Sequence, residues 1–334
     1  MVGDTVSNAG SELSQRQKGI TSVCTSAQGG QLVHHGLLHP PSANVADIVT
    51  PLIAERLAGH ERVLAVLPPA VAAQLHHRLP TTVGLHTTDV GELYRHPGRV
   101  LGHYLGWIAD TSPSPDGTAT IIAAAQLDTD NPHRAALWMH VDALITQALA
   151  DCDLTLICAY PHDPATAAAI RHAHPSLLNG AATPNPDHLP ADQFLAHHPL
   201  PPPSELGQPH DIHILDHPAQ LTELRQRVSA HAARAGLPSC RGEDFVLAVS
   251  EVASNAVEHG APPAAVCLWT TSTSVICQVS DNGHFTQPLA GLLPPHASQN
   301  RARGLWIAHQ LCDELYCWPH PTTIRLHIDR HGPV

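Results

Sequence analysis

The sequence predicts an α/β domain, a Pro-rich linker and then an α+β domain. Short apolar runs alternate with helical patterns as far as residue 180, which is typical of a parallel sheet with crossover helices. Prolines are dense between residues 181 and 208. From residue 209 the order becomes two helices, two strands, a helix and a strand, which favours helices grouped on a sheet.

The N-terminal third follows this pattern after a polar start. Residues 1–29 are rich in Ser, Thr, Gly and Gln without a sustained period, so we expect a flexible tail. In the domain at 30–180, "RVLAVLPP" at 62–69 is an apolar run stopped by two prolines, as in a buried parallel strand. We expect further elements as a helix over 70–79, a strand over 118–127, an amphipathic helix over 133–152 and a strand over 154–160.

The C-terminal domain at 209–334 follows a segment, 181–208, that we predict to be a partly extended linker. Its expected elements are helices over 219–237 and 242–260, strands over 264–271 and 274–283, a helix over 304–315 and a strand over 322–329. Gly260 and the prolines after it end the second helix. We expect the helices to cover one face of a mixed sheet.

The helix over 242–260 has two different sides. A buried stripe is predicted at Val246, Val249, Ala253 and Ala256, and a polar stripe at Glu251, Asn255 and Glu258. Taken alone, such a polar stripe is most typical of a solvated helix face. Its interpretation therefore depends on the segments that follow.

Two later segments place more polar chemistry in this domain. The predicted strand over 274–283 ends with Asp281, Asn282 and Gly283. Asp281 is either a turn residue or an acceptor for an exocyclic amine. Gly283 would allow a flat ring to approach the backbone closely. "RARGLW" at 301–306 then opens a helix, and the free N–H groups of a helix N-terminus suit a phosphate.

In this order, the segments "LAVSEVASNAVEHG", "SDNG" and "RGLWIAHQLCDEL" resemble the N, G1 and G2 boxes of the GHKL ATPase superfamily, which comprises gyrase, Hsp90, histidine kinases and MutL. They look most like the anti-sigma-factor serine kinases of the RsbW/SpoIIAB type, in the form common in actinobacterial members. The resemblance covers about residues 211–329. It implies a Bergerat-type ATP-binding sandwich with ATP and Mg²⁺ as cofactors.

The resemblance also implies roles for individual residues. Asn255 would be the Mg²⁺ ligand, since an amide oxygen suits a hard cation. Glu251 would be the catalytic residue that orients or deprotonates the attacking group. The cofactor-binding residues implied are Asn255, Asp281, Gly283, Arg303, Gly304, Leu305 and Thr323. Two glycines usual in these boxes are replaced by His284 and Ala302, which could crowd the loop over the phosphates. Binding is therefore better supported than catalysis.

The first domain resembles the MEDS sensory domain, named after the DcmR regulator, over about residues 31–179. The resemblance rests on "HHGLLHPPSANVADIVT", "LICAYPHD" and "HAHPSLLNG". It implies a sensor of an unidentified small ligand, with His35, His140 and Tyr160 as candidate sensory residues. The sequence departs from the family pattern in two places. The family's His-Glu pair appears as His140-Val141, and its Glu-Pro-Val-Trp element is missing near 121–127. Ordinary core or surface roles stay open for all three.

Composition excludes some classes of protein. The 334 residues carry 29 acidic and 17 basic side chains, a formal charge of -12, so we expect no nucleic-acid partner. The first twenty residues lack the apolar core of a signal peptide, and no apolar run is long enough to span a membrane. We therefore expect a cytoplasmic protein. The 28 His and 8 Cys form no HExxH or CxxC motif, and we interpret the histidines as composition rather than a metal site.

These patterns favour a sensor joined to a serine/threonine kinase of the anti-sigma-factor type. Such a kinase would act on a STAS-domain anti-sigma antagonist, control a sigma factor and form a homodimer. A nucleotide-dependent binding module without catalysis is the first alternative. A sensor histidine kinase is the second, but His231 is followed by Ala232 rather than by the acidic residue usual after a phosphoacceptor.

Overall fold

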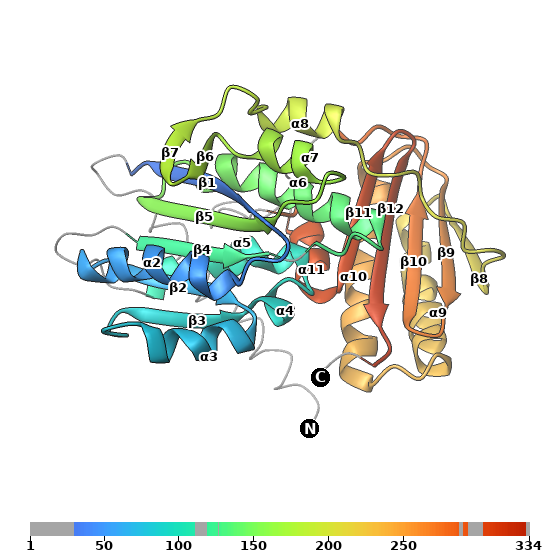
Figure 1. Cartoon of the computed structure of the whole chain (residues 1–334). Coiled ribbons are helices and arrows are strands. Elements are labelled where there is room, and N and C mark those ends of the chain that lie inside the picture. Colours follow the sequence, from blue (N-terminus) through green and yellow to red (C-terminus); the bar gives the residue numbers. More distant parts are fainter. Residues whose placement is uncertain (1–29, 111–118, 126, 287–289, 293–302, 332–334) are drawn as a thin grey trace. The chain divides into compact units, whose positions relative to one another are not determined.

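The computed structural model describes residues 30–110, 119–125, 127–286, 290–292 and 303–331 (Figure 1). The predicted flexible tail at 1–29 lies outside this description. The chain divides into two compact units, Met1–Arg95 with Val100–Pro201, and His96–Arg99 with Pro202–Val334.

The first unit contains a seven-stranded sheet in the order β3-β2-β4-β5-β1-β6-β7. Its strands are β1 (Leu32–His39), β2 (Arg62–Leu67), β3 (Leu85–Asp89), β4 (Ala119–Ala124), β5 (Leu154–Pro161), β6 (Ser176–Asn179) and β7 (Ala181–Pro184). The pairs are parallel except β6 with β7. The continuous burial of β2 and β4 fits strands covered on both faces. The expected α/β class is confirmed.

Helices lie on both faces of this sheet. They are α2 (Val45–Ala58), α3 (Pro69–Arg78), α4 (Val90–Leu93), α5 (Val100–Asp110), α6 (Pro132–Ala148), α7 (Ala167–Ala173) and α8 (Ala191–His197). The α2 and α3 side chains share one core cluster with Ile157 and Ala159 of β5. The alternate β5 residues, Cys158 and Tyr160, instead contact Asp142 of α6. Because strand side chains alternate between faces, α6 covers the opposite face.

The segment predicted as a linker is folded over much of its length. Residues 181–184 form β7, an edge strand of the first sheet, and α8 packs against α6 and α7. Phe194 of α8 is fully buried, with its ring centroid 4.7 Å from that of His198. A single well-placed aromatic side chain anchors this Pro-rich stretch, which composition alone does not reveal. The boundary between the units falls between residues 201 and 202.

The second unit contains a five-stranded sheet in the order β11-β12-β10-β9-β8. Its strands are β8 (Asp211–Leu215), β9 (Ala264–Thr270), β10 (Ser274–Ser280), β11 (Glu314–Pro319) and β12 (Thr322–Asp329). Every pair is antiparallel, so the expectation of a mixed sheet was wrong. The prediction lacked β8 and β11, and it extended the helix from 304 to 315.

That helix, α11 (Gly304–Leu311), ends where the chain joins the sheet. Cys312 is extended, and the backbone N–H of Asp313 donates to the carbonyl of His327 in β12. The Asp313 carboxylate accepts from Arg241 of α10. The next strand, β11, begins at Glu314, so the predicted helix ran beyond its observed end at Leu311 into the start of this strand.

Helices α9 (Leu221–Arg234), α10 (Ser239–Glu258) and α11 share one core with the sheet. The α10 side of this core consists of Phe245, Ala248, Val249, Val252, Ala253 and Ala256, all buried. The strands contribute alternate residues, such as Val275, Cys277 and Val279 of β10. Alternation places this core on one face of the sheet, in agreement with the expected one-sided layer.

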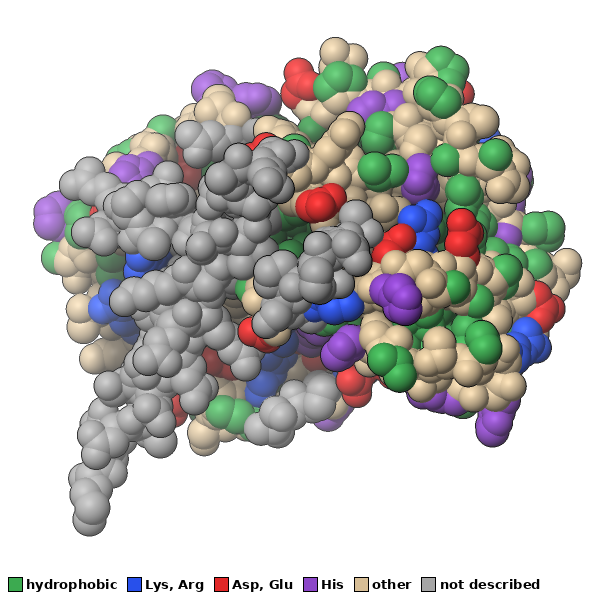
Figure 2. Space-filling model, turned by 90° about the vertical axis from the view of Figure 1, so that its left-hand side faces the viewer, with side chains coloured by type: hydrophobic (Ala, Val, Ile, Leu, Met, Phe, Trp, Pro, Cys, Tyr) green, Lys and Arg blue, Asp and Glu red, His purple; other side chains and the backbone are tan. Residues whose placement is uncertain are grey.

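The other face is partly covered by the chain that enters the unit. Arg325 of β12 donates to the carbonyl of Ser204, 3.1 Å away, and the Trp269 indole donates to the carbonyl of Gly207, also at 3.1 Å. On the surface shown in Figure 2, Lys and Arg side chains are few and lie among acidic and apolar groups. No helix within the described ranges is long and apolar enough to cross a membrane.

The folded state of residues 191–197 can be tested at Phe194. Its replacement by Ala should lower the free energy of unfolding by about 3–5 kcal/mol, because a fully buried ring is lost. Gln193→Ala, at the exposed neighbouring position, is the control and should change it by less than about 0.5 kcal/mol. Chemical denaturation of the full chain measures both. Equal, small effects would mean that this stretch is a linker after all.

Candidate functional site

The polar side of α10 carries Glu251 and Asn255, one helical turn apart and both half-buried. Burial of the opposite side of α10 fixes the rotation of the helix and hence the direction of these two side chains. The Asn255 side-chain amide has no hydrogen-bond partner among the described residues. Its oxygen is therefore available to a ligand, as the sequence predicts for a Mg²⁺ site.

The start of α11 lies against Glu251. A Cβ placed on Gly304 would lie too close to Oε2 of Glu251, so glycine leaves room for the Glu251 carboxylate in its present position. No described side chain caps the first turn of α11, and the N–H groups of a helix start suit a negatively charged acceptor. Leu305 packs its side chain into the core, so only its backbone can face a ligand. Arg303, half-buried, is the residue directly before the helix.

The environment of Glu251 changes its acidity. Burial raises the pKa of this carboxyl; Arg225 opposes the rise and Glu258 adds to it. The Arg225 guanidinium is held by a 2.8 Å hydrogen bond from Nε to the Ser250 hydroxyl. A carboxylate with a raised pKa is a better proton acceptor, which suits a general base.

Asp281 is fixed at the end of β10 by the backbone. Its Oδ1 accepts from the N–H groups of Gly283 at 2.6 Å and Ala261 at 3.2 Å. Oδ2 accepts no hydrogen bond from the described part of the chain. The carboxylate is buried, yet one oxygen is left for an outside donor, which fits an exocyclic amine.

Two glycines make room for this carboxylate. A Cβ on Gly283 would lie 2.6 Å from Asp281 Oδ1, and one on Gly260 would lie 2.8 Å from Oδ2. The sequence predicts Gly260 only as a helix stop, so its second role was missed, as was the Ala261 N–H. Thr323 is buried on β12 and donates to the Ser280 hydroxyl at 3.3 Å, and Ser280 directly precedes Asp281.

Of the two residues that replace glycines usual in the family, His284 lies within the described part of the chain. The exposed His284 ring lies against His320, with 2.7 Å between their Nδ1 atoms. His320 belongs to the turn between β11 and β12. Ala302 lies outside the described residues.

These groups fit a nucleotide with a divalent cation. A carboxylate oxygen that accepts no hydrogen bond from the described residues suits an adenine amine, an amide without a partner among them suits Mg²⁺, and the helix start beside Glu251 suits phosphates. The fit rests on two observations. Oδ2 of Asp281 accepts no hydrogen bond from the described residues, and Gly304 lies close to Glu251.

The first unit offers two pockets at the carboxyl ends of its parallel strands, where ligands bind in open α/β sheets. The larger, about 430 Å³, is lined by Pro41, Leu127, Thr129, Tyr160, Pro161, His162, Asp163, Pro164 and Thr166. Its walls follow β1, β4 and β5. This volume falls in the range of small-molecule sites.

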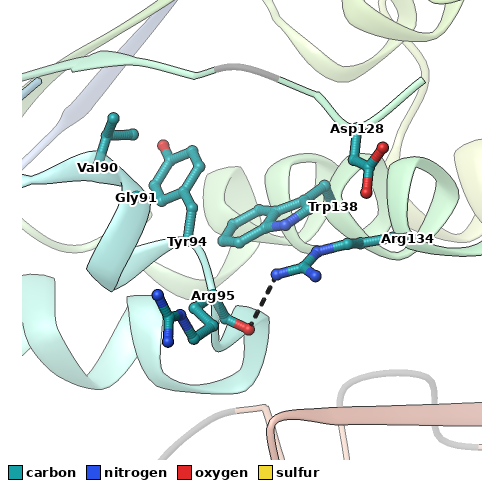
Figure 3. A pocket seen from close by; sticks show the side chains of 7 residues that line it. All are labelled: Val90, Gly91, Tyr94, Arg95, Asp128, Arg134 and Trp138. Carbon is teal, nitrogen blue, oxygen red and sulfur yellow. Dashed lines mark hydrogen bonds between the residues drawn. The ribbon is translucent and has the colours of Figure 1, made fainter. Parts of the chain in front are cut away.

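The smaller pocket, about 200 Å³, lies beside α4 (Figure 3). The Tyr94 and Trp138 rings stack with centroids 4.1 Å apart, and Arg134 donates to the carbonyl of Arg95 at 3.3 Å. Asp128 lies near Arg134 at the rim (Figure 3). Nothing in the sequence analysis indicated this pocket, because its residues come from separate segments.

The three candidate sensory residues lie in different places. Tyr160 lines the larger pocket and its hydroxyl donates to Asp142 at 2.8 Å. His35 contacts the Ser176 hydroxyl at 2.5 Å, and His140 donates to the carbonyl of His198 at 2.6 Å. Burial lowers the pKa of both histidines. They do not join Tyr160 in one site.

The buried position of Glu251 predicts a pH-dependent cost. Its folded pKa is raised, so its contribution to stability is fully present below the unfolded pKa, about 4.3, and is lost as pH rises through the folded value. Glu251→Gln should match the wild type in acid and be more stable at neutral pH. Denaturant titrations at several pH values measure this, with Glu243→Gln at an exposed position of α10 as the control. A gain that does not vary with pH would contradict it.

Comparison with known families agrees with this geometry. The model of the histidine kinase-like ATPase domain matches residues 214–328. The model of the MEDS domain, the methanogen/methylotroph and DcmR sensory domain, matches residues 33–175. A search of curated proteins found no match. The chain therefore contains a MEDS sensory domain at 33–175 and a histidine kinase-like ATPase domain at 214–328.

Proposed function

We propose that the C-terminal domain is a serine/threonine kinase of the anti-sigma-factor type that uses ATP and Mg²⁺ under control of the MEDS domain. The domain pair is that of a sensor-gated ATP-binding signalling protein. The observation that carries the kinase proposal is Glu251, a half-buried carboxylate on the same side of α10 as Asn255 and pressed against the start of α11.

Each residue has a defined part in this proposal. Asn255 would ligate Mg²⁺, the backbone at Gly304 and Leu305 would bind phosphate oxygens, and Asp281 would accept from the adenine amine. Thr323 would support the adenine side of the site, with Gly283 beneath the ring and Arg303 near the phosphates. Bound ATP would supply the phosphoryl group and Mg²⁺ the charge compensation.

Glu251 would hold the proton of the acceptor hydroxyl during transfer. Its raised pKa brings its basicity closer to neutral pH than that of an exposed carboxylate. The partner would be a STAS-domain antagonist whose Ser or Thr is phosphorylated, so that a sigma factor is controlled. A homodimer of the domain belongs to the same proposal.

A module that binds nucleotide and partner without catalysis is the second candidate. The His284 side chain favours it, because glycine is usual there and a ring limits how the adjoining loop can move. A histidine kinase is less well supported. His231 is only 4% exposed and its Nε2 lies 3.0 Å from the Thr270 hydroxyl, so this ring is not presented to a phosphoryl donor.

For the MEDS domain, we propose that the sensed small molecule binds in the 430 Å³ pocket at Tyr160. The pocket adjoins the neighbouring strands β1 and β5, whose connections run to opposite sides of the sheet. Such a switch point is the usual ligand position in open α/β sheets. The other pocket is below the usual volume of a ligand site.

Nucleotide binding can be tested at Asn255. Replacement by Ala removes the proposed Mg²⁺ ligand, so the Kd for Mg-ATP should rise by at least about tenfold, or 1.4 kcal/mol. Calorimetry on the full chain measures the Kd, with Glu243→Gln as the matched control. The wild type should also bind ATP more weakly when Mg²⁺ is omitted. Absence of binding heat in the wild type at millimolar Mg-ATP would refute the proposal.

Catalysis can be tested separately at Glu251. Glu251→Gln keeps the size of the side chain but removes the base, so phosphoryl transfer to a purified STAS antagonist should fall by about 10²–10⁴-fold while Mg-ATP still binds. Transfer of labelled phosphate is the measurement. If the wild type binds ATP and the antagonist but transfers no phosphate, the non-catalytic module is the correct function.

A further inference from the structure

The interior of the first unit contains a group of four side chains that the sequence analysis did not single out. His34 lies on β1, Asp142 on α6, Cys158 on β5, and His174 directly after α7. All four are buried, with exposed fractions between 0 and 3% for His34, Asp142, Cys158 and His174. They occupy the face of the sheet that α6 covers.

The fold brings these residues together from distant parts of the chain. β1 and β5 are adjacent parallel strands, and their register pairs His34 with Leu156. Cys158 lies two residues further along β5, so its side chain is on the same face of the sheet as His34. A Cβ on Gly36, between them, would lie 2.8 Å from the His174 ring. Glycine at this position therefore leaves the space that His174 occupies.

The potential ligand atoms have the spacing of a small coordination site. His174 Nε2 lies 3.2 Å from Asp142 Oδ2, and His34 Nε2 lies 3.4 Å from Cys158 Sγ. Asp142 Oδ1 lies 3.6 Å from Cys158 Sγ and 3.7 Å from His34 Nε2. One ligand atom from each residue can be chosen so that all lie within 4.8 Å of one another. Donors around a tetrahedral Zn²⁺ are separated by about 3.3–3.6 Å, given its usual bond lengths.

Both imidazoles are held so that Nε2 faces the group. His174 Nδ1 donates to the carbonyl of Ile170 at 2.6 Å, and His34 Nδ1 contacts the Thr146 hydroxyl at 2.9 Å. Tyr160 donates to Asp142 Oδ2 at 2.8 Å. Metal-binding histidines and carboxylates characteristically have such second contacts, which fix the tautomer and the ring orientation.

One buried nitrogen in this group lacks a hydrogen-bond partner among the described residues. Nδ1 of His174 donates to the carbonyl of Ile170, so Nε2 is the ring atom that points into the group, 3.2 Å from Asp142 Oδ2. Nε2 makes no hydrogen bond to any described residue. The ion-pair partners of the Asp142 carboxylate are the two histidines alone, among the described residues. A buried carboxylate needs a positive partner, which a metal ion between these atoms would provide.

We propose that His34, Asp142, Cys158 and His174 bind one divalent transition-metal ion, with Zn²⁺ as the best match. Two imidazoles, one thiolate and one carboxylate are all zinc ligands, and four protein ligands leave no open position in a tetrahedral site. The thiolate disfavours Mg²⁺ and Ca²⁺, which prefer oxygen ligands. The site is separate from the nucleotide site and does not depend on the proposed kinase function.

A second histidine group provides the control. His172, His197 and His198 also lie close enough to share an ion, but they are partly exposed. His172 Nδ1 and His198 Nε2, 2.8 Å apart, already satisfy each other by a hydrogen bond. Surface histidines can bind metal weakly, so this group must be separated experimentally from the buried one. Cys240, an exposed free thiol, serves the same purpose for sulfur.

The test uses full-length protein stripped of metal under reducing conditions and titrated with Co²⁺. We expect a thiolate-to-cobalt charge-transfer band and tetrahedral visible bands that saturate at one ion per chain, with Zn²⁺ displacing Co²⁺. Cys158→Ser should abolish the charge-transfer band. The Cys240→Ser variant and the triple variant His172→Ala, His197→Ala, His198→Ala should keep it. Circular dichroism checks that each variant is folded.

A milder variant tests the same site without removing a ligand. Tyr160→Phe loses only the hydroxyl that positions Asp142, so Zn²⁺ affinity should fall by about 10–100-fold with the stoichiometry unchanged. A wild-type protein without a charge-transfer band overturns the proposal and leaves a protonated histidine as the partner of Asp142. A band that survives Cys158→Ser, or that disappears in the triple histidine variant, overturns it as well.

Discussion

Packing of α10 on the antiparallel sheet is the constraint on which the C-terminal site depends. Six buried side chains of this helix, from Phe245 to Ala256, face the strands and neighbouring helices. Because they fix the rotation of the helix, Glu251 and Asn255 lie on its other side, and Glu251 contacts the start of α11. Gly304 then allows α11 to begin in contact with Glu251. The geometry of the candidate site is thus a consequence of core packing, and burial of the half-buried Glu251 disfavours the charged form of its carboxyl.

In the first unit, Asp142 connects two features that would otherwise be unrelated. It belongs to the proposed metal group, and it also accepts from Tyr160, which lines the larger pocket. A ligand that displaces the Tyr160 hydroxyl would therefore change a contact of the metal-binding carboxylate. The reverse also holds, since a metal ion that moves Asp142 would reshape the pocket wall. The hydrogen bond from Tyr160 to Asp142 thus connects the two proposed sites.

The sequence predicted those features that local patterns encode. The helical period placed Glu251 and Asn255 on one side of α10, and the strand end placed Asp281 in a turn with Gly283. It did not predict β8 or β11, because strands of five and six residues carry little periodic signal. It also missed the anchoring of α8 by Phe194, since one buried aromatic is invisible in a Pro-rich composition. The buried group from His34 to His174 was missed for a further reason: its members are brought together only by strand order.

The central claim is that the polar side of α10, the end of β10 and the start of α11 form one Mg-ATP site. Hydrogen-exchange mass spectrometry of the full chain, with and without Mg²⁺ and a non-hydrolysable ATP analogue, tests it most directly. We predict that the analogue slows exchange both in the first turn of α11 and around Asp281 and Gly283. The full slowing should require Mg²⁺. Unchanged exchange in both segments at saturating analogue, or protection confined to the MEDS domain, would contradict the account.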